Sequence, residues 1–119
     1  MKLTPELKLF LSKQSKHYCK FLKLNLPSII YTDEELLKIG LKPEQIRKIR
    51  QYELGRSWPK GSLKDINKDI IFLNLDDSDF LWQMVDILVH ELVHIKYQNF
   101  RHGSKFQNTV NNIIVKTCI

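Results

Sequence analysis

FLWQMVDILVHELVHIKYQ, Phe80 to Gln98, is the stretch that decides the fold. Apolar side chains occupy nearly every direction around this segment at helical spacing, so it predicts one long helix with Ser78 or Asp79 as its N-cap. A helix that is apolar around almost its whole circumference must be covered by the rest of the chain. The 119 residues suffice for one hydrophobic core and are too few for two, so we expect this helix at the centre of a single domain.

The segments just before this helix have the composition of strands and turns. Residues 55–61 (GRSWPKG) are typical of a loop, and residues 62–65 and 69–75 flank a turn at 66–68. This pattern predicts a β-hairpin whose second arm is apolar enough to pack against a helix. Residues 28–31 (SIIY) predict one more short strand. Strands and helices in this mixture indicate an α+β fold.

Helices are predicted at both ends of the chain and in its first half. Thr4 and Pro5 are a good helix start, and apolar spacing continues to about residue 24. Thr32 begins a capping box for a short helix that ends at Gly40, and a second helix spans about residues 43–54. This helix–glycine–helix pair superficially resembles a DNA-binding helix-turn-helix, a common pattern. A last helix begins near residue 104, with its apolar face formed by Phe106, Val110, Ile113 and Ile114.

Charge and hydropathy limit the classes of function. The formal net charge is +6, and residues 1–23 contain six lysines against one glutamate. A basic balance favours anionic partners, nucleic acid first, although many solvated surfaces are equally rich in lysine. Apolar runs are too short to span a bilayer, and charged residues interrupt the N-terminal stretch where a secretory signal would be apolar. We therefore expect a cytoplasmic (intracellular) protein, nucleoid association included, with no membrane partner and with free thiols at Cys19 and Cys118.

The central helix contains the motif H-E-x-x-H at residues 90–94. His90 and His94 are four residues apart, so they lie on one face of the helix, with Glu91 about 100° round it. In this pattern two imidazoles bind zinc, and the glutamate is the general base for a water whose pKa the metal lowers to about 7. The competing interpretation is a pair of ordinary core histidines that are hydrogen-bonded and bind no metal.

A hydrolytic zinc site needs a third protein ligand and an open fourth position. No Asp or Glu follows Glu91, and positions 97 and 100 are not the glycine and histidine of the metzincin pattern. Apart from the terminal cysteine, His102 is the remaining downstream residue of ordinary zinc-ligand chemistry. It follows His94 by eight residues, enough to end the helix, turn and return. The sequence therefore predicts one Zn²⁺ per chain, held by His90, His94 and His102.

H-E-L-V-H followed by a short loop and H-G-x-x-F at residues 102–106 resembles the SprT-like zinc metalloproteases and the related minimal peptidases of the YgjP-like and WLM type. The resemblance covers about residues 55–115. It includes I-x-L-N at 71–74 and Gly55-Arg56, where these families place the active-site strand. The eight-residue step between the second and third histidines is closer to the minimal peptidases. The resemblance implies a small zincin-like (minigluzincin) α+β domain over residues 1–119, with a short antiparallel β-sheet packed on a central buried HExxH helix and flanking helices.

For function, the resemblance implies a zinc metallopeptidase that hydrolyses protein or peptide, including protein bound to or crosslinked with DNA. By analogy, the peptide would lie extended against residues 70–74 as an edge strand. The alternative is a small basic DNA-binding module that uses the helix at 43–54 and has a non-catalytic or structural zinc site. Glu91 discriminates between the two, because a structural site has no use for a carboxylate between two ligands.

Two further residues are candidates for supporting the site. Tyr97 is two turns after His90 and could donate a hydrogen bond to the developing oxyanion, although such a tyrosine is more often the edge of an amphipathic helix. Asp86 is one turn before His90 and could accept the second ring N–H, although a solvated aspartate is the ordinary case. His17 is expected on the surface of the first helix.

Overall fold

The computed structural model describes residues 1–76, 78–98 and 104–117. These residues form an α+β fold of five helices and a three-stranded sheet. In chain order the elements are α1 (Pro5–Leu22), β1 (Ser28–Ile30), α2 (Asp33–Lys38), α3 (Pro43–Tyr52), β2 (Gly55–Trp58), β3 (Ile70–Leu73), α4 (Leu81–Lys96) and α5 (Ser104–Thr117).

The sheet is mixed, so the prediction of an antiparallel sheet was wrong. Its strand order is β1-β3-β2. β2 pairs antiparallel with β3, with Ser57 opposite Ile71, whereas β1 pairs parallel to β3, with Ile29 opposite the same residue. Parallel pairing needs a long crossover, and α2 and α3 provide it between β1 and the later strands. The prediction that residues 70–74 form an edge was also wrong, since β3 is the central strand and β1 and β2 are the two edges.

The first arm of the predicted hairpin lies earlier in the chain than expected. Residues 55–58, assigned to a loop from their glycine and nearby proline, form β2, whereas residues 62–65 belong to the connection between β2 and β3. A glycine inside a strand marks a close approach of another element. Gly55 has this role, because a Cβ atom built on it would lie 2.7 Å from the side chain of Ile87 on α4.

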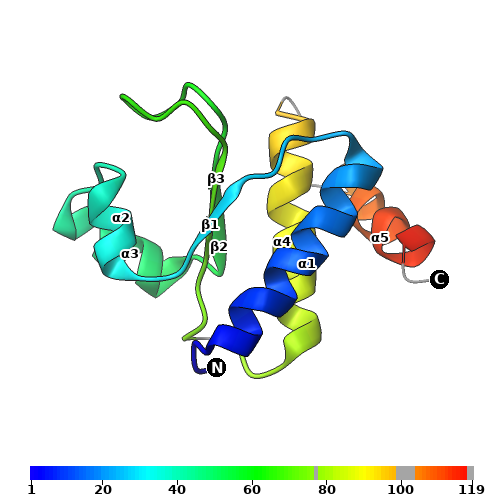
Figure 1. The fold of residues 1–119 in the computed structure, drawn as a ribbon, viewed down its shortest axis with the longest axis horizontal. Coiled ribbons are helices and arrows are strands. Elements are labelled where there is room, and N and C mark those ends of the chain that lie inside the picture. The colour runs from blue at the N-terminus through cyan, green and yellow to red at the C-terminus, as the bar shows by residue number, and fades with distance from the viewer. Residues whose placement is uncertain (77, 99–103, 118–119) are drawn as a thin grey trace.

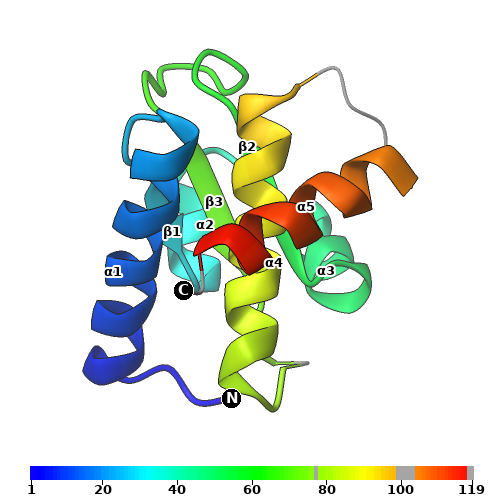
Figure 2. The ribbon, with the colours of Figure 1, turned by 90° about the vertical axis from the view of Figure 1, so that its right-hand side faces the viewer.

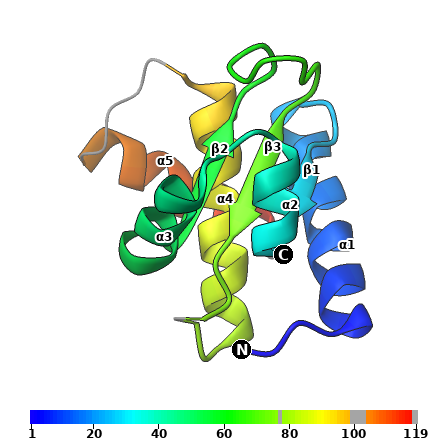
Figure 3. The same cartoon turned by 90° about the vertical axis from the view of Figure 1, so that its left-hand side faces the viewer.

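The sheet lies between α2 and α3 on one side and α1, α4 and α5 on the other (Figure 1). It separates two hydrophobic clusters, so all four β3 residues are buried. Ile71 and Leu73 pack with α1, α4 and α5 on one face. Ile70 and Phe72 pack with α2 and α3 on the other face, which Figure 3 shows in front of the sheet. Successive side chains of a strand point to opposite faces, so an apolar run such as IIFL fits a strand covered on both sides.

α4 lies at the centre of the larger cluster, as the sequence predicts. α1 packs along one side of it, β2 and β3 along another, and α5 crosses it on the outside (Figure 2). Its residues from Met84 to Ile95 are buried or half-buried, but Leu81 and Trp82 in its first turn are 43% and 66% exposed, so the apolar surface is not covered throughout. The predicted N-cap was also wrong by one or two residues. Phe80 holds that position, and the Gln83 side chain accepts from its N–H.

The helix starts predicted at Thr4 and Thr32 are confirmed. The Thr4 hydroxyl accepts from the N–H of Leu7, and Thr32 forms a full capping box with Glu35. His17 is exposed on α1, and Cys19 is a buried free thiol. Cys118 lies outside the described residues. None of the described helices is both long and apolar enough to cross a bilayer.

Candidate active site

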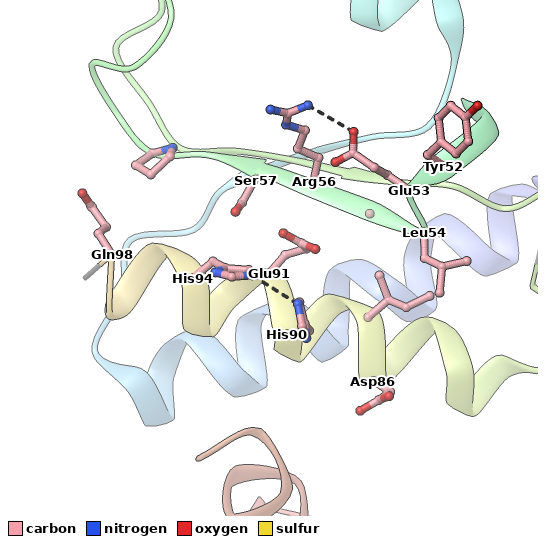
Figure 4. A pocket seen from close by; sticks show the side chains of 13 residues that line it. Tyr52, Glu53, Leu54, Arg56, Ser57, Asp86, His90, Glu91, His94 and Gln98 are labelled. Atoms are coloured by element: carbon pink, nitrogen blue, oxygen red, sulfur yellow. Dashed lines mark hydrogen bonds and ion pairs between the residues drawn. The ribbon is translucent and has the colours of Figure 1, made fainter. Parts of the chain in front are cut away.

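A cleft of about 640 Å³ runs between the edge strand β2 and the helix α4 (Figure 4). β2 and the residues just before it form one wall, and α4 forms the other. The α4 side chains that line it are Asp86, Ile87, His90, Glu91 and His94. The motif predicted from the sequence therefore opens onto a cleft bounded by a strand edge.

His90 and His94 point toward one another from successive turns of α4 (Figure 4). Their Nε2 atoms are 3.1 Å apart. Two nitrogens bound to one tetrahedral zinc ion at bonds of about 2.0–2.1 Å lie about 3.3 Å apart. The two imidazoles thus fit a shared metal ion with little movement. The same distance also fits a hydrogen bond between neutral rings, which is the metal-free interpretation.

Phe106 of α5 packs against both imidazoles. Its ring centroid lies 4.6 Å from that of His90 and 4.4 Å from that of His94, and only 1% of the residue is exposed. The contact with His90 is edge-to-face, a favoured arrangement of aromatic rings. The prediction that Phe106 is buried in the core is confirmed, and its position restricts the rotamers of both histidines.

Glu91 lies between α4 and β2 and is only 5% exposed. Its Oε2 atom would be 3.3 Å from a Cβ atom on Gly55, so the glycine makes room for the carboxylate. Burial raises the pKa of Glu91 to about 7, and the Ser57 hydroxyl, which points toward it from β2, partly opposes this rise. A carboxyl group with a pKa near neutrality both accepts and returns a proton efficiently, as general acid–base catalysis requires.

The third predicted ligand, His102, lies outside the described residues. Both flanks of its segment reach the site, because Gln98 lines the cleft and Phe106 contacts the two imidazoles. Within the described part of the chain, no group of three or more His, Cys, Asp or Glu side chains gathers as a metal-binding cluster.

The two supporting candidates lie in different surroundings. Asp86 is half-buried at the cleft, where burial raises the pKa of its carboxyl group. Figure 4 shows it on the flank of α4 away from β2. Tyr97 is the C-cap of α4 and packs against the hydrophobic core; it is not among the described residues that line the cleft. This position favours the structural interpretation of Tyr97 over a role at an oxyanion.

Asn74, which the sequence offered only as part of a motif, holds the wall of the cleft in place. The residue is fully buried, and its Nδ2 donates to the carbonyls of Arg50 and Glu53 at 3.1 and 3.0 Å. Its backbone N–H donates to the carbonyl of Leu54 at 2.9 Å. These three bonds fix the chain between α3 and β2. Each joins residues about twenty positions apart, so local sequence patterns do not reveal them.

No protein-family model, curated protein or solved structure matches this chain.

Proposed function

We propose that this protein is a zinc-dependent metallopeptidase. The observation that supports it most is the convergence of the His90 and His94 Nε2 atoms at 3.1 Å beside the buried carboxyl group of Glu91. A pair of ordinary core histidines would not account for the buried acid beside them, because burying a carboxylate costs free energy. The proposed chemistry is that of the SprT-like and minimal peptidases, which the motif resembles.

In this proposal, His90, His94 and His102 hold the zinc ion. When bound, zinc supplies Lewis acidity, which polarises the scissile carbonyl and makes water acidic enough to attack at neutral pH. Glu91 takes the proton from the attacking water and passes it to the leaving amine. Its burial between α4 and Gly55 keeps the carboxyl group in one place and limits its contact with bulk water.

The outer edge of β2, which pairs with no strand among the described residues, is the proposed binding site for the peptide main chain. β2 pairs with β3 on one side, and its residues Gly55 to Ser57 line the cleft opposite the motif. An extended peptide can add to such an edge through main-chain hydrogen bonds. This replaces the expectation that the peptide lies against residues 70–74.

Protein bound to DNA remains the proposed substrate class, and the lysines of α1 support it. Lys13, Lys16 and Lys20 are exposed and share the face of α1 opposite its buried side. In the alternative, a DNA-binding module using α3, Arg50 would contribute little to binding, because it is engaged with Asp33 and the carbonyl of Tyr31.

The test is zinc content together with peptide hydrolysis. Wild-type protein should contain about one zinc per chain, and His102→Ala should lose most of it. Glu91→Gln should keep the metal and lose hydrolysis by at least about a hundredfold. Glu44→Gln, an exposed glutamate on α3, is the matched control and should change neither quantity. Metal loss in Glu91→Gln would make Glu91 a ligand, and metal-free wild type from zinc-sufficient cells would refute the proposal.

A further inference from the structure

Two large apolar side chains stand exposed at one end of the cleft. Tyr52 is 75% exposed and Leu54 is 50% exposed, and both line the cleft. Single exposed apolar residues are common on protein surfaces and need no explanation. A group of them at the mouth of a concave site is different, because apolar walls are what such sites offer to a ligand.

Ile87 completes this end of the cleft from the other wall. It lines the cleft from α4, one turn before Glu91, and its Cγ2 atom would be 2.7 Å from a Cβ atom on Gly55, the residue after Leu54. Figure 4 shows Leu54 and Tyr52 beyond His90, at the end opposite His94 and Gln98. The apolar surface is therefore adjacent to the proposed reacting centre.

The backbone that presents Leu54 is rigid. Its carbonyl accepts from the N–H of Asn74, and the carbonyl of the preceding Glu53 accepts from the Asn74 side chain. Asn74 itself is fully buried. A side chain held on a fixed backbone loses less entropy when a ligand covers it, so its contact with the ligand is worth more.

We propose that Tyr52, Leu54 and Ile87 form a subsite for a large apolar side chain of the substrate, on one side of the scissile bond. The inference rests on the proposed peptidase function, for which it defines a substrate preference. A leucine, methionine or phenylalanine side chain would cover the exposed surface of Leu54 and Tyr52 and be removed from water against Ile87. A small or polar side chain would leave that apolar surface exposed to solvent.

Asp86 also lines the cleft, and its carboxyl group suggests the main alternative, a preference for a basic substrate side chain. Its side chain has no hydrogen bond or ion pair within the described part of the chain. A lysine or arginine could place its stem on the apolar wall and its charge near this carboxylate. We favour the apolar occupant because Asp86 lies on the flank of α4 away from Leu54 (Figure 4).

The test is to digest a diverse peptide library with zinc-loaded wild-type protein and sequence the cleavage sites. Large apolar residues should be enriched at one position on one side of the cleaved bond. For a matched pair of peptides with leucine or serine at that position, Leu54→Asn should lower kcat/KM for the leucine peptide about tenfold and leave the serine peptide nearly unchanged. Tyr52→Ala should act in the same direction. Thermal unfolding of each variant checks that the fold is intact.

The matched control is Leu37→Asn. Leu37 is also 50% exposed but belongs to α2, on the other face of the sheet, so both peptides should be cleaved as by wild type. Cleavage without an apolar preference, or a preference that survives Leu54→Asn and Tyr52→Ala, would overturn the subsite and leave the peptidase function standing. A preference for lysine or arginine that Asp86→Asn abolishes would also overturn the apolar subsite and leave the peptidase function standing. Absence of any cleavage would instead refute the proposed function, and the subsite with it.

Discussion

The Oε2 atom of Glu91 lies 3.3 Å from the place that a Cβ atom would occupy on Gly55. The same Cβ atom would be 2.7 Å from Cγ2 of Ile87 and 3.1 Å from the carbonyl oxygen of Phe72. β2 can therefore approach α4 this closely only because residue 55 has no side chain. The position of the proposed general base depends on a strand residue far from it in sequence.

Gly55→Ala is expected to damage both stability and hydrolysis. The added methyl group forces β2 away from α4 or turns Ile87 and Glu91, and such overpacking costs about 1–3 kcal/mol. Displacement of Glu91 should also lower kcat by at least about tenfold, since a misplaced general base transfers protons poorly. Urea unfolding and peptide hydrolysis measure the two effects.

Gly40→Ala separates these effects. Gly40 has φ +102°, which strains an alanine, but a Cβ atom there meets nothing within 4 Å. The variant should lose about 1 kcal/mol or more through backbone strain and retain full kcat. Equal losses of activity in the two variants would show that general destabilisation, and not the position of Glu91, explains the effect of Gly55→Ala.

Phe106→Ala is expected to weaken zinc binding as well as the fold. Loss of a fully buried aromatic side chain costs roughly 3–5 kcal/mol. The ring also packs on His90 and His94, so its removal frees both imidazoles to leave the geometry in which their Nε2 atoms converge. Chemical unfolding of the metal-free protein and zinc affinity from chelator competition measure the two effects.

Val110→Ala is the matched control in the same helix. Val110 is fully buried one turn after Phe106, and it has no aromatic ring to pack on the histidines. The Val110→Ala substitution should lower the free energy of unfolding and leave zinc affinity nearly unchanged. If Phe106→Ala leaves zinc affinity unchanged while destabilising the fold, Phe106 is a core residue and does not position the ligands.

The sequence predicts features of this protein that depend on neighbouring residues. The caps at Thr4 and Thr32 use hydrogen bonds to residues three positions away, and the periodicity of α4 and α5 follows from helix geometry. His90 and His94 are four residues apart on one helix, so their convergence also follows from local spacing. These elements were predicted correctly because the interactions that define them are short-range.

The errors in the sheet concern residues whose state depends on distant parts of the chain. Gly55 and Ser57 have low strand propensity, yet β2 forms because β3 supplies its hydrogen bonds and α4 covers it. The parallel pairing of β1 with β3, and the place of β3 at the centre, depend on how α2 and α3 pack. Tertiary contacts of this kind outweigh the intrinsic strand propensity of single residues. Local patterns accordingly did not locate the part of the site on β2, which was indicated only by the family resemblance at Gly55-Arg56.

DNA binding, if it supplies the substrate, should depend on the α1 lysines. Replacing Lys13, Lys16 and Lys20 by glutamine should weaken binding to DNA of any sequence. The slope of log K against log salt concentration should become shallower by roughly 2–3, because each lysine–phosphate contact releases about one counterion. The matched control replaces the exposed loop lysines Lys60, Lys64 and Lys68 and removes the same charge. Fluorescence anisotropy over a salt series gives both quantities. Equal losses in the two triple variants would assign binding to net charge alone.

The metal-free protein should be destabilised by ionisation of Glu91. The pKa of its carboxyl group is about 7 in the fold against 4.5 ordinarily, because burial disfavours the charged form. Below pH 4.5 the carboxyl group is protonated in both states and has no effect. Between the two pKa values the unfolded chain releases this proton and the folded chain keeps it, so the free energy of unfolding falls as pH rises. The loss levels off above pH 7 at about 3 kcal/mol.

Glu91→Gln isolates this contribution from the titration of the neighbouring histidines. Gln has nearly the same shape and no charge, so the variant should match wild type in stability near pH 4.5 and exceed it by about 3 kcal/mol near pH 8. Urea unfolding of both proteins in chelator, at pH values across this range, gives the difference directly. Bound zinc should reverse the trend for wild type, because a cation near Glu91 favours its ionised form. A difference that stays constant with pH would show that Glu91 ionises in the fold as it does in water, and that burial between α4 and β2 does not tune it for proton transfer.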